Sequence, residues 1–410
     1  MRHPKEIPVA KTLEGNACIG QSGGPTAVIN QSLVGAVEEA RKHAPIKKIL
    51  GAVHGTAGMM AETFLDLTRT SQKKLDAVAE SPSAALGSCR HKPDEDDCAA
   101  ILDVLQKHNV RYYFYIGGDD SAQSTDILAG MARREGYEMR CLHIPKTIDN
   151  NLMESDHAPG FGSAARFVAS ALRGDDLDNR SIPGIKVDII MGRDAGWLAA
   201  SSVLARQAEG DGPHLIYLPE APFTVEAFLA DVKRVVAEHG RAVIAASEGI
   251  RDESGKLWAK RLAEESKADV AGDAFGHFQL SGTGALADYL TMCIKEGVKG
   301  IGRVRGDTFG YLQRSFPGFA SRVDQREARE VGRAAVRYAC QGKDGSVAIK
   351  RKKTKKYASY TDLVALERVA GKNREVPKTY IARGGNDIRP SFVDYCLPLV
   401  GGLPPTTSLV

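Results

Sequence analysis

The sequence predicts an α/β protein built on parallel sheets. Short apolar runs that end in glycine or a charged residue alternate with amphipathic stretches, which is the pattern of successive βαβ units. The chain has 410 residues, of which 43% are hydrophobic and 26% charged, so it is long enough for two or three core-forming units. We therefore expect a large buried core.

The individual elements follow from these patterns. The apolar runs predict strands at Ala17–Gln21, Lys48–Val53, Tyr112–Ile116, Cys141–Pro145, Val187–Met191, His214–Leu218, Ala242–Ser247 and Gly300–Val304. The amphipathic stretches predict helices at Ala27–Arg41, Asp97–Lys107, Gln123–Arg134, Ser163–Leu172, Gly196–Ala208, Val225–Glu238, Thr283–Ile294 and Ser321–Tyr338. Polar motifs follow the strands directly: QSGG, IGGDDS, PKTIDN, MGRDAG, PEAPF and SEG. Because ligands bind at the carboxyl edge of open parallel sheets, we expect one shared cleft there.

Composition disfavours several classes of protein. The 55 basic and 51 acidic residues leave a formal charge of +4, which is too small to indicate nucleic-acid binding. The basic run from Lys350 to Lys356 has no aromatic platform beside it, so we expect it on a solvated loop or strand edge. No stretch reaches the roughly 18 uninterrupted apolar residues of a membrane span, and the start, MRHPKEIPVAKTLEG, lacks an apolar core. We expect a cytoplasmic protein without a membrane or nucleic-acid partner.

The seven scattered cysteines form no CxxC pair, which disfavours zinc and a disulfide framework.

The first predicted strand leads into a small-residue loop, Gly20-Gln21-Ser22-Gly23-Gly24-Pro25-Thr26, ahead of a helix. Small residues let backbone amides approach a phosphate, and Gly23 and Gly24 are the best candidates for this contact. A tight turn that requires positive φ explains the loop about equally well. The loop is neither a Walker motif nor a GxGxxG fingerprint.

A second loop carries two adjacent carboxylates in Gly117-Gly118-Asp119-Asp120-Ser121. Neighbouring carboxylates at a strand end repel each other unless a cation or a proton lies near them, so Mg²⁺ is the natural partner, with Asp119 as its ligand. A helix cap would explain one of these residues but not the whole set.

A third loop, Pro145-Lys146-Thr147-Ile148-Asp149-Asn150-Asn151, offers a base and a cation. Phosphoryl transfer to an alcohol needs a carboxylate to accept the hydroxyl proton and a positive charge beside the moving phosphoryl group. Asp149 and Lys146 can supply these roles. Taken alone, the segment is better explained by residues that commonly form turns, such as Pro-Lys and Asp-Asn.

Seven segments together resemble the phosphofructokinases, and specifically their pyrophosphate-using branch. They are SGG (22–24), LGSCR (86–90), GGDDS (117–121), PKTIDN (145–150), MGR (191–193), SEG (247–249) and GYLQR (310–314). The resemblance implies two Rossmann-like three-layer α/β/α domains with mostly parallel sheets and an active site in the cleft between them. It implies a phosphoryl-donor domain at 1–160, a sugar-phosphate domain at 161–312, and C-terminal helices and a tail at 313–410 that pack back on both.

The resemblance also implies how the donor is chosen. ATP-using members have glycine where this chain has Asp120 and Lys146. The Asp120 carboxylate would fill the space of a nucleotide α-phosphate, and its charge would repel that phosphate. The implied catalytic residues are Asp149, Lys146 and Asp120, and the implied pyrophosphate ligands are Gly23, Gly24, Arg90 and Lys146.

The sugar-phosphate site that the resemblance implies comprises Thr147, Ile148, Asp149, Met191, Gly192, Arg193, Glu248, Arg305, Tyr311, Leu312, Gln313 and Arg314. Arginine suits a phosphate dianion because its planar fork donates two parallel hydrogen bonds. Each arginine taken singly is better explained by a surface ion pair, but the MGR and GYLQR contexts reverse that order.

Two positions depart from the family. Asn151 stands where the family usually has a second aspartate after TIDN, so the metal would depend more on Asp119, Asp120 and the pyrophosphate. Gly184 stands where short ATP-using relatives have an arginine that reaches a neighbouring subunit, and Arg180 is the nearby candidate to replace it.

The resemblance implies Mg²⁺-dependent, reversible phosphoryl transfer from pyrophosphate to the 1-hydroxyl of fructose 6-phosphate, giving fructose 1,6-bisphosphate and phosphate in glycolysis or gluconeogenesis. It also implies a homodimer or homotetramer. Two alternatives stay open: an ATP-dependent phosphofructokinase, and a non-catalytic regulatory subunit that binds sugar phosphate.

Overall fold

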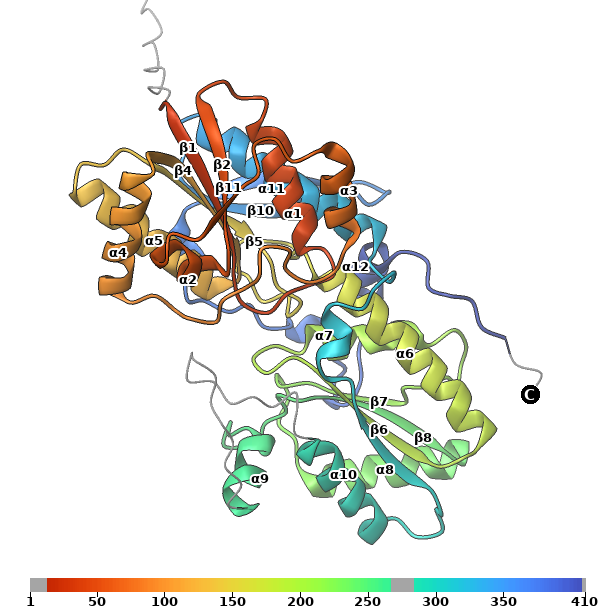
Figure 1. Ribbon diagram of the computed structural model, residues 1–410. Helices are drawn as coiled ribbons and strands as arrows, with labels where there is room; N and C mark the ends of the chain where they lie inside the picture. The colour runs from red at the N-terminus through yellow and green to blue at the C-terminus, as the bar shows by residue number, and fades with distance from the viewer. Residues whose placement is uncertain (1–12, 267–283, 408–410) are drawn as a thin grey trace, which may run out of the picture.

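Two sheets, each covered by helices on both faces, form the two halves of the molecule (Figure 1). The computed structural model describes residues 13–266 and 284–407. Most of the N-terminal stretch discussed above, and Thr283 at the start of one predicted helix, lie outside these residues. The mostly parallel three-layer architecture predicted from the sequence is confirmed.

The first sheet has seven strands in the order β11-β10-β5-β4-β1-β2-β3, and only the two edge strands β11 and β3 run antiparallel to their neighbours. The bounds are β1 Gly15–Gln21, β2 Ile46–Ala52, β3 Phe64–Asp66, β4 Val110–Gly117, β5 Arg140–Pro145, β10 Gly345–Arg351 and β11 Ser359–Val364. Apolar side chains of α1 (Ile29–Ala40), α3 (Gln72–Glu80) and α11 (Arg322–Cys340) pack on one face. Those of α2 (Gly55–Met60), α4 (Glu95–Lys107) and α5 (Asp119–Arg134) pack on the other.

The second sheet has four parallel strands in the order β7-β8-β6-β9. Their bounds are β6 Ile185–Ile190, β7 Leu215–Tyr217, β8 Ala242–Ser247 and β9 Val304–Thr308. One face carries α6 (Phe161–Ser181), α7 (Trp197–Ser201), the 3₁₀ turn η1 (Ser202–Ala205) and α12 (Pro390–Val400). The opposite face carries α8 (Val225–His239), α9 (Trp258–Ser266) and α10 (Ala285–Gly297).

The C-terminal part of the chain visits both halves. Helix α11 packs against α1, and strands β10 and β11 extend the first sheet. The 3₁₀ turns η3 (Leu366–Arg368) and η4 (Lys378–Tyr380) follow, and α12 then packs against α6 of the second half. Phe392 and Tyr395 of α12 contact the ring of Trp197 at centroid distances of 6.2 and 5.5 Å. This segment therefore holds the two halves together.

Some elements differ from the prediction. Strand β9 begins at Val304, where the predicted strand ended. The prediction missed this strand because Arg305 and Asp307 lie exposed along a sheet edge, so the strand is not an apolar run. The predicted helix at Gly196–Ala208 is a short α7 followed by η1. Helix α6 continues past the predicted end at Leu172 to Ser181. The prediction ended too early because the second half of the helix is rich in polar residues. Strands β10 and β11 were not predicted. The basic run from Lys350 lies at the end of β10 and in the exposed turn after it.

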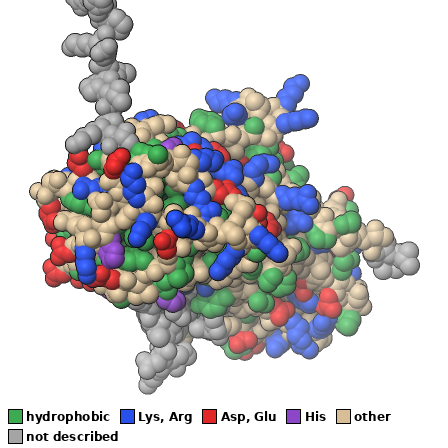
Figure 2. Space-filling view, turned by 45° about the horizontal axis from the view of Figure 1, so that its top comes forward, with side chains coloured by type: hydrophobic (Ala, Val, Ile, Leu, Met, Phe, Trp, Pro, Cys, Tyr) green, Lys and Arg blue, Asp and Glu red, His purple; other side chains and the backbone are tan. Residues whose placement is uncertain are grey.

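Charged side chains of both signs are interspersed over the face shown in Figure 2. This agrees with the small formal charge of +4. Among the described residues, no helix is both long and apolar enough to cross a membrane.

Candidate active site

A cavity of about 590 Å³ lies where the loops at the carboxyl ends of both sheets meet. It gathers motifs that are far apart in the sequence, as expected for the shared edge of two parallel sheets. The predicted site residues that line it are Gly23, Gly24, Arg90, Asp119, Asp120, Lys146, Thr147, Ile148, Asp149, Met191, Arg193, Glu248, Tyr311 and Arg314.

The glycine loop after β1 combines a left-handed backbone conformation with close contacts to cations. Gly23 has a φ of +71°, which side chains other than glycine rarely adopt. A Cβ atom on Gly23 would lie 3.2 Å from the Lys146 ammonium, and one on Gly24 would lie 2.9 Å from Nη1 of Arg314. Gly23 therefore serves both the turn and the approach of a cation, and Gly24 leaves room for the Arg314 guanidinium. Helix α1 begins only at Ile29, so these residues line the cavity from the loop and not from the first helical turn.

The tandem carboxylates lie in the first turn of α5, which begins at Asp119. Burial, and next the charge of Asp120, raise the pKa of Asp119 above its ordinary value. Asp120 is paired instead: its Oδ1 atom lies 2.8 Å from Nζ of Lys92. One of the two charges is thus neutralised by a lysine that was not among the predicted site residues. A cation near Asp119 would relieve the remaining charge, so this carboxylate fits a divalent metal.

Lys146 and Asp149 follow β5 and enter the cavity with perturbed ionisation. Burial, and next the charge of Arg314, lower the pKa of Lys146 to about 7. Burial, and next the charge of Asp194, raise the pKa of Asp149 to about 6. The Lys146 ammonium donates a hydrogen bond to the carbonyl oxygen of Gly24 at 2.8 Å. A carboxylate and an ammonium that both titrate near neutral pH suit proton transfer and charge stabilisation.

The loop after Asp149 is held by the C-terminal segment. Asn150 has a φ of +54°, and its side-chain amide donates to the Tyr395 hydroxyl at 2.8 Å. Arg374 donates to the Asn150 carbonyl oxygen at 2.8 Å. The amide of Asn151 donates to Oδ1 of Asn373 at 2.5 Å. Asn151, the departure from the family pattern, lines the cavity together with Asn373.

The second half of the molecule contributes Met191, Arg193 and Glu248 to the cavity. Arg193 forms an ion pair with Asp194 at 3.1 Å. Glu248 accepts a long hydrogen bond of 3.4 Å from the Gly192 amide. Gly192 lies behind the lining and does not reach the cavity.

The turn η2 (Gly310–Arg314) divides its side chains between cavity, core and solvent. Tyr311 and Arg314 line the cavity, with the guanidinium 4.5 Å from the ring centroid. Gln313 is 2% exposed, and its side-chain oxygen accepts from the Met191 amide at 3.3 Å. Leu312 is 63% exposed. Arg314 therefore lies against Gly24 of the glycine loop, although the family resemblance implies a role for it only in the sugar-phosphate site.

Arg305 on β9 does not line the cavity. Its guanidinium donates to the carbonyl oxygen of Val304 at 3.0 Å. Arg180, the candidate to replace the arginine missing at Gly184, is ion-paired with Asp176 at 2.9 Å and with Asp211. Arg180 is therefore already held within the second half of the molecule.

Other lining residues were not predicted. Lys92 and Asp194 stand two residues and one residue after Arg90 and Arg193, so position beside a motif could have indicated them. Gly371 and Asn373 come from the C-terminal segment and have no such signal, because only the fold brings them to the cavity.

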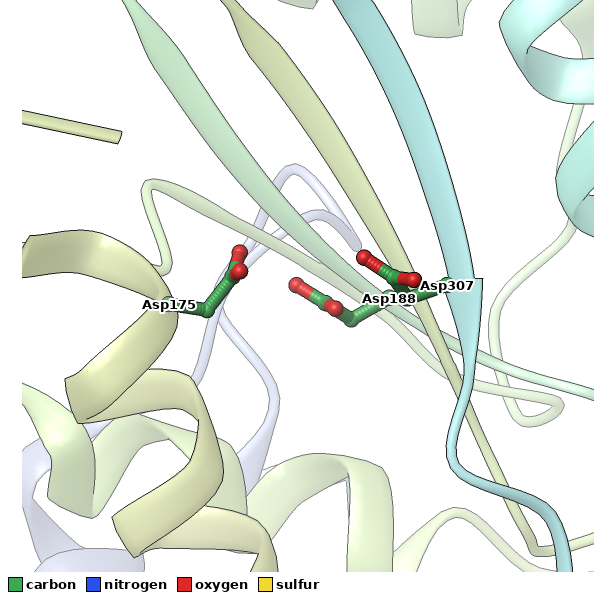
Figure 3. Close-up of side chains that lie close together, drawn as sticks. All are labelled: Asp175, Asp188 and Asp307. Atoms are coloured by element: carbon green, nitrogen blue, oxygen red, sulfur yellow. The ribbon is translucent and has the colours of Figure 1, made fainter. Parts of the chain in front are cut away.

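A separate acidic cluster lies on the second sheet, where Asp188 of β6, Asp307 of β9 and Asp175 of α6 approach one another (Figure 3). Their carboxylate oxygens lie within 4.8 Å of one another, but none of the three lines the cavity. Lys186 is ion-paired with Asp175. Burial, and next the charge of Asp175, raise the pKa of Asp188 well above its ordinary value. A proton on Asp188 and the positive charge of Lys186 would each offset part of the negative charge of this cluster.

A cavity between two α/β domains, lined by a glycine loop and by several cations, is typical of enzymes that act on phosphorylated substrates. Residues 16–339 match the family model described as phosphofructokinase. The chain belongs to the phosphofructokinase family.

Relatives of known name agree with this assignment. The chain is 52% identical over 393 residues to "Pyrophosphate--fructose 6-phosphate 1-phosphotransferase" of Rhodospirillum rubrum, covering 95% of this chain and 96% of that protein. It is 38% identical to the protein of the same name from Xanthomonas campestris, covering 95% and 93%. The crystal structure of a pyrophosphate-dependent phosphofructokinase from Marinobacter aquaeolei is similar with a TM-score of 0.83 at 33% identity, covering 96% of this chain and 94% of that one.

Proposed function

We propose that this enzyme transfers a phosphoryl group from pyrophosphate to the 1-hydroxyl of fructose 6-phosphate, reversibly. The observation that carries the proposal is that Asp120 and Lys146, the two residues that the family resemblance associates with pyrophosphate use, line the same cavity as Asp149. The relatives from Rhodospirillum rubrum and Xanthomonas campestris are named for this reaction.

In this mechanism the 1-hydroxyl attacks a phosphorus atom of pyrophosphate in line, and Asp149 accepts the hydroxyl proton. A pKa of about 6 leaves Asp149 ionised at neutral pH but basic enough to take that proton. Lys146, already directed at the Gly24 carbonyl oxygen, offsets charge on the leaving phosphate. Binding an anion there raises the pKa of Lys146 and keeps its ammonium charged.

Asp119 is the residue that would hold Mg²⁺. Its desolvated carboxylate next to Asp120 fits a hard cation with oxygen ligands. The metal would neutralise charge on the phosphate oxygens when bound. On the acceptor side, Thr147, Met191, Arg193, Glu248 and Tyr311 would contact the sugar phosphate.

The alternatives make different predictions for turnover. An ATP-dependent enzyme would need room and compensating charge where Asp120 lies, and a non-catalytic subunit would not need Asp149 and Lys146 in one cavity. The test is steady-state turnover of fructose 6-phosphate with pyrophosphate and with ATP as donors. A higher kcat/KM with ATP would favour the first alternative, and no turnover with either donor would favour the second.

We also propose a homodimer or homotetramer. Two large apolar side chains in and just after η2 are exposed, Leu312 at 63% and Phe316 at 42%, and a second copy could cover them. Light scattering after size-exclusion chromatography measures the mass, and a monomer at micromolar concentration would contradict this proposal.

A further inference from the structure

The side chain of Arg374 holds the loop that follows Asp149. Its guanidinium donates hydrogen bonds to three carbonyl oxygens of that loop: Asn150 at 2.8 Å, Ser155 at 2.9 Å and Asp156 at 2.7 Å. Arginine can bind several acceptors at once because its donors form a rigid planar fork. One side chain therefore fixes both the end of the loop beside Asp149 and its far end at Asp156.

The same residue is anchored on the second half of the molecule. Cζ of Arg374 lies 4.4 Å from the ring centroid of Trp197, which begins α7, and the indole Nε1 atom donates to the Arg374 carbonyl oxygen at 3.0 Å. Two positions further on, the Val376 amide donates to the Glu220 carboxylate at 2.8 Å. That carboxylate also accepts from the Gly196 amide at 2.9 Å. Arg374 therefore joins a loop of the first half to the start of α7 in the second.

The two joined segments carry opposite sides of the proposed reaction. Asp149 directly precedes the held loop, Arg193 lies shortly before Trp197, and both line the cavity. The base must lie within hydrogen-bond reach of the sugar hydroxyl, and a misplacement of about 1 Å can lower a rate by about 10²-fold. Arg374 itself does not line the cavity, so it can affect the reaction only through the residues that it holds.

We propose that Arg374 is a positioning residue for phosphoryl transfer: by tying the two segments together, it sets the distance between Asp149 and the sugar side of the cavity at Arg193. Arg374 lies beyond residues 16–339, which match the family model. The inference rests on the proposed function and adds to it a residue from outside the cavity lining.

The experiment is a double-mutant cycle of the wild type, Arg374→Met, Asp149→Asn and the double variant. Methionine keeps an unbranched side chain that can lie against Trp197, but it removes every donor of the fork. Two quantities are measured: kcat by a coupled assay, and the dissociation constant of fructose 6-phosphate by calorimetry.

We expect Arg374→Met to lower kcat by about 10²-fold in the wild-type background, because the base is no longer held in place. The dissociation constant of the sugar should change by less than about threefold, since its ligands remain. In the Asp149→Asn background the same change should lower kcat by less than about threefold, because the group that Arg374 positions no longer acts. An equal loss in both backgrounds, or no loss in the wild-type background, would overturn the proposal.

Arg374→Lys keeps the test decisive if Arg374→Met does not fold. Lysine retains the charge but lacks the planar fork, so it cannot hold all three carbonyl oxygens in the same way. Its kcat should fall less than that of a folded methionine variant, and the loss should again disappear in the Asp149→Asn background. Full activity of Arg374→Lys, or a loss of equal size in both backgrounds, would contradict the proposal.

Arg173→Met is the matched control. Arg173 also donates to three carbonyl oxygens, those of Leu204 and Ala205 at 3.1 Å and of Pro404 at 2.9 Å, but none of them belongs to the loop after Asp149. Its kcat should equal that of the wild type even if its Tm falls as far as that of Arg374→Met. A comparable loss of kcat in Arg173→Met would assign the effect to lower stability and overturn the proposal.

The choice of donor separates this inference from the proposed function. The cycle is run with the donor that the wild type turns over, so use of ATP in place of pyrophosphate would contradict the proposed donor and still test Arg374. If neither donor is turned over, the function fails, and hydrogen exchange of the amides at 149–157 tests the hold on the loop. Exchange that is faster in Arg374→Met and confined to this loop would support the inference, whereas unchanged exchange would overturn it.

Discussion

The ammonium of Lys146 lies 2.8 Å from the carbonyl oxygen of Gly24, 122 residues earlier in the chain. The side chain therefore crosses from the loop after β5 to the loop after β1. Burial lowers its pKa to about 7, so the protein holds this lysine at the edge of losing its charge. An anionic donor between the two loops would restore that charge, which couples donor binding to the protonation of Lys146.

The first prediction concerns the base. Asp149→Asn should lower kcat by roughly 10²–10⁴, the usual contribution of a general base, and should leave fructose 6-phosphate binding largely intact. Turnover by a coupled assay and sugar binding by calorimetry check both parts. Asp103→Asn, on the exposed surface of α4, is the matched control. Near-normal turnover of Asp149→Asn would remove Asp149 from this role.

The second prediction is a bell-shaped pH profile of kcat/KM for pyrophosphate. Asp149 must be ionised, so activity should fall as the pH drops below about 6. Lys146 must be protonated, so activity should fall as the pH rises above about 7. Asp194→Asn should move the acidic limb to lower pH because it removes a negative charge that raises the pKa of Asp149.

Lys146→Arg supplies the other half of that test. Arginine stays charged throughout this range, so the alkaline limb should disappear even if the overall rate is lower. An alkaline limb that persists unchanged in Lys146→Arg would assign it to a different group.

The third prediction concerns the metal. Asn151→Asp should lower the Mg²⁺ concentration needed for half-maximal rate, because it adds a carboxylate to the lining that already contains Asp119. Asn151→Ala removes the hydrogen bond to Asn373 without adding charge and is the control. If both variants have the Mg²⁺ dependence of the wild type, position 151 lies out of reach of the metal.

The fourth prediction concerns the acidic cluster on the second sheet. The raised pKa of Asp188 means that the folded state keeps a proton that the unfolded chain loses above about pH 4. Folding is therefore penalised increasingly as the pH rises above that value. Asn cannot ionise, so Asp188→Asn should raise Tm more at pH 8 than at pH 5, as measured by calorimetry. Stabilisation of the wild type by a divalent cation, lost in Asp188→Asn, would instead identify a metal site.

The sequence alone was sufficient for the α/β class, for the positions of most of the parallel strands, and for most of the cavity lining. The reason is local: a buried parallel strand is a continuous apolar run, and the polar residues that follow it lie at the edge where ligands bind. Gly23, Asp119 and Lys146 could be found in this way because each directly follows such a strand.

Only the tertiary structure decided the partners of these residues. The pairing of Lys92 with Asp120, the approach of Arg314 to Gly24, and the support of Asn151 by Asn373 join segments that have no common pattern in the sequence. The same holds for Arg305, which the family resemblance placed in the sugar-phosphate site but which its edge strand leaves outside the cavity. Strand periodicity reports which residues are buried, whereas these contacts depend on how two sheets and the C-terminal segment pack together.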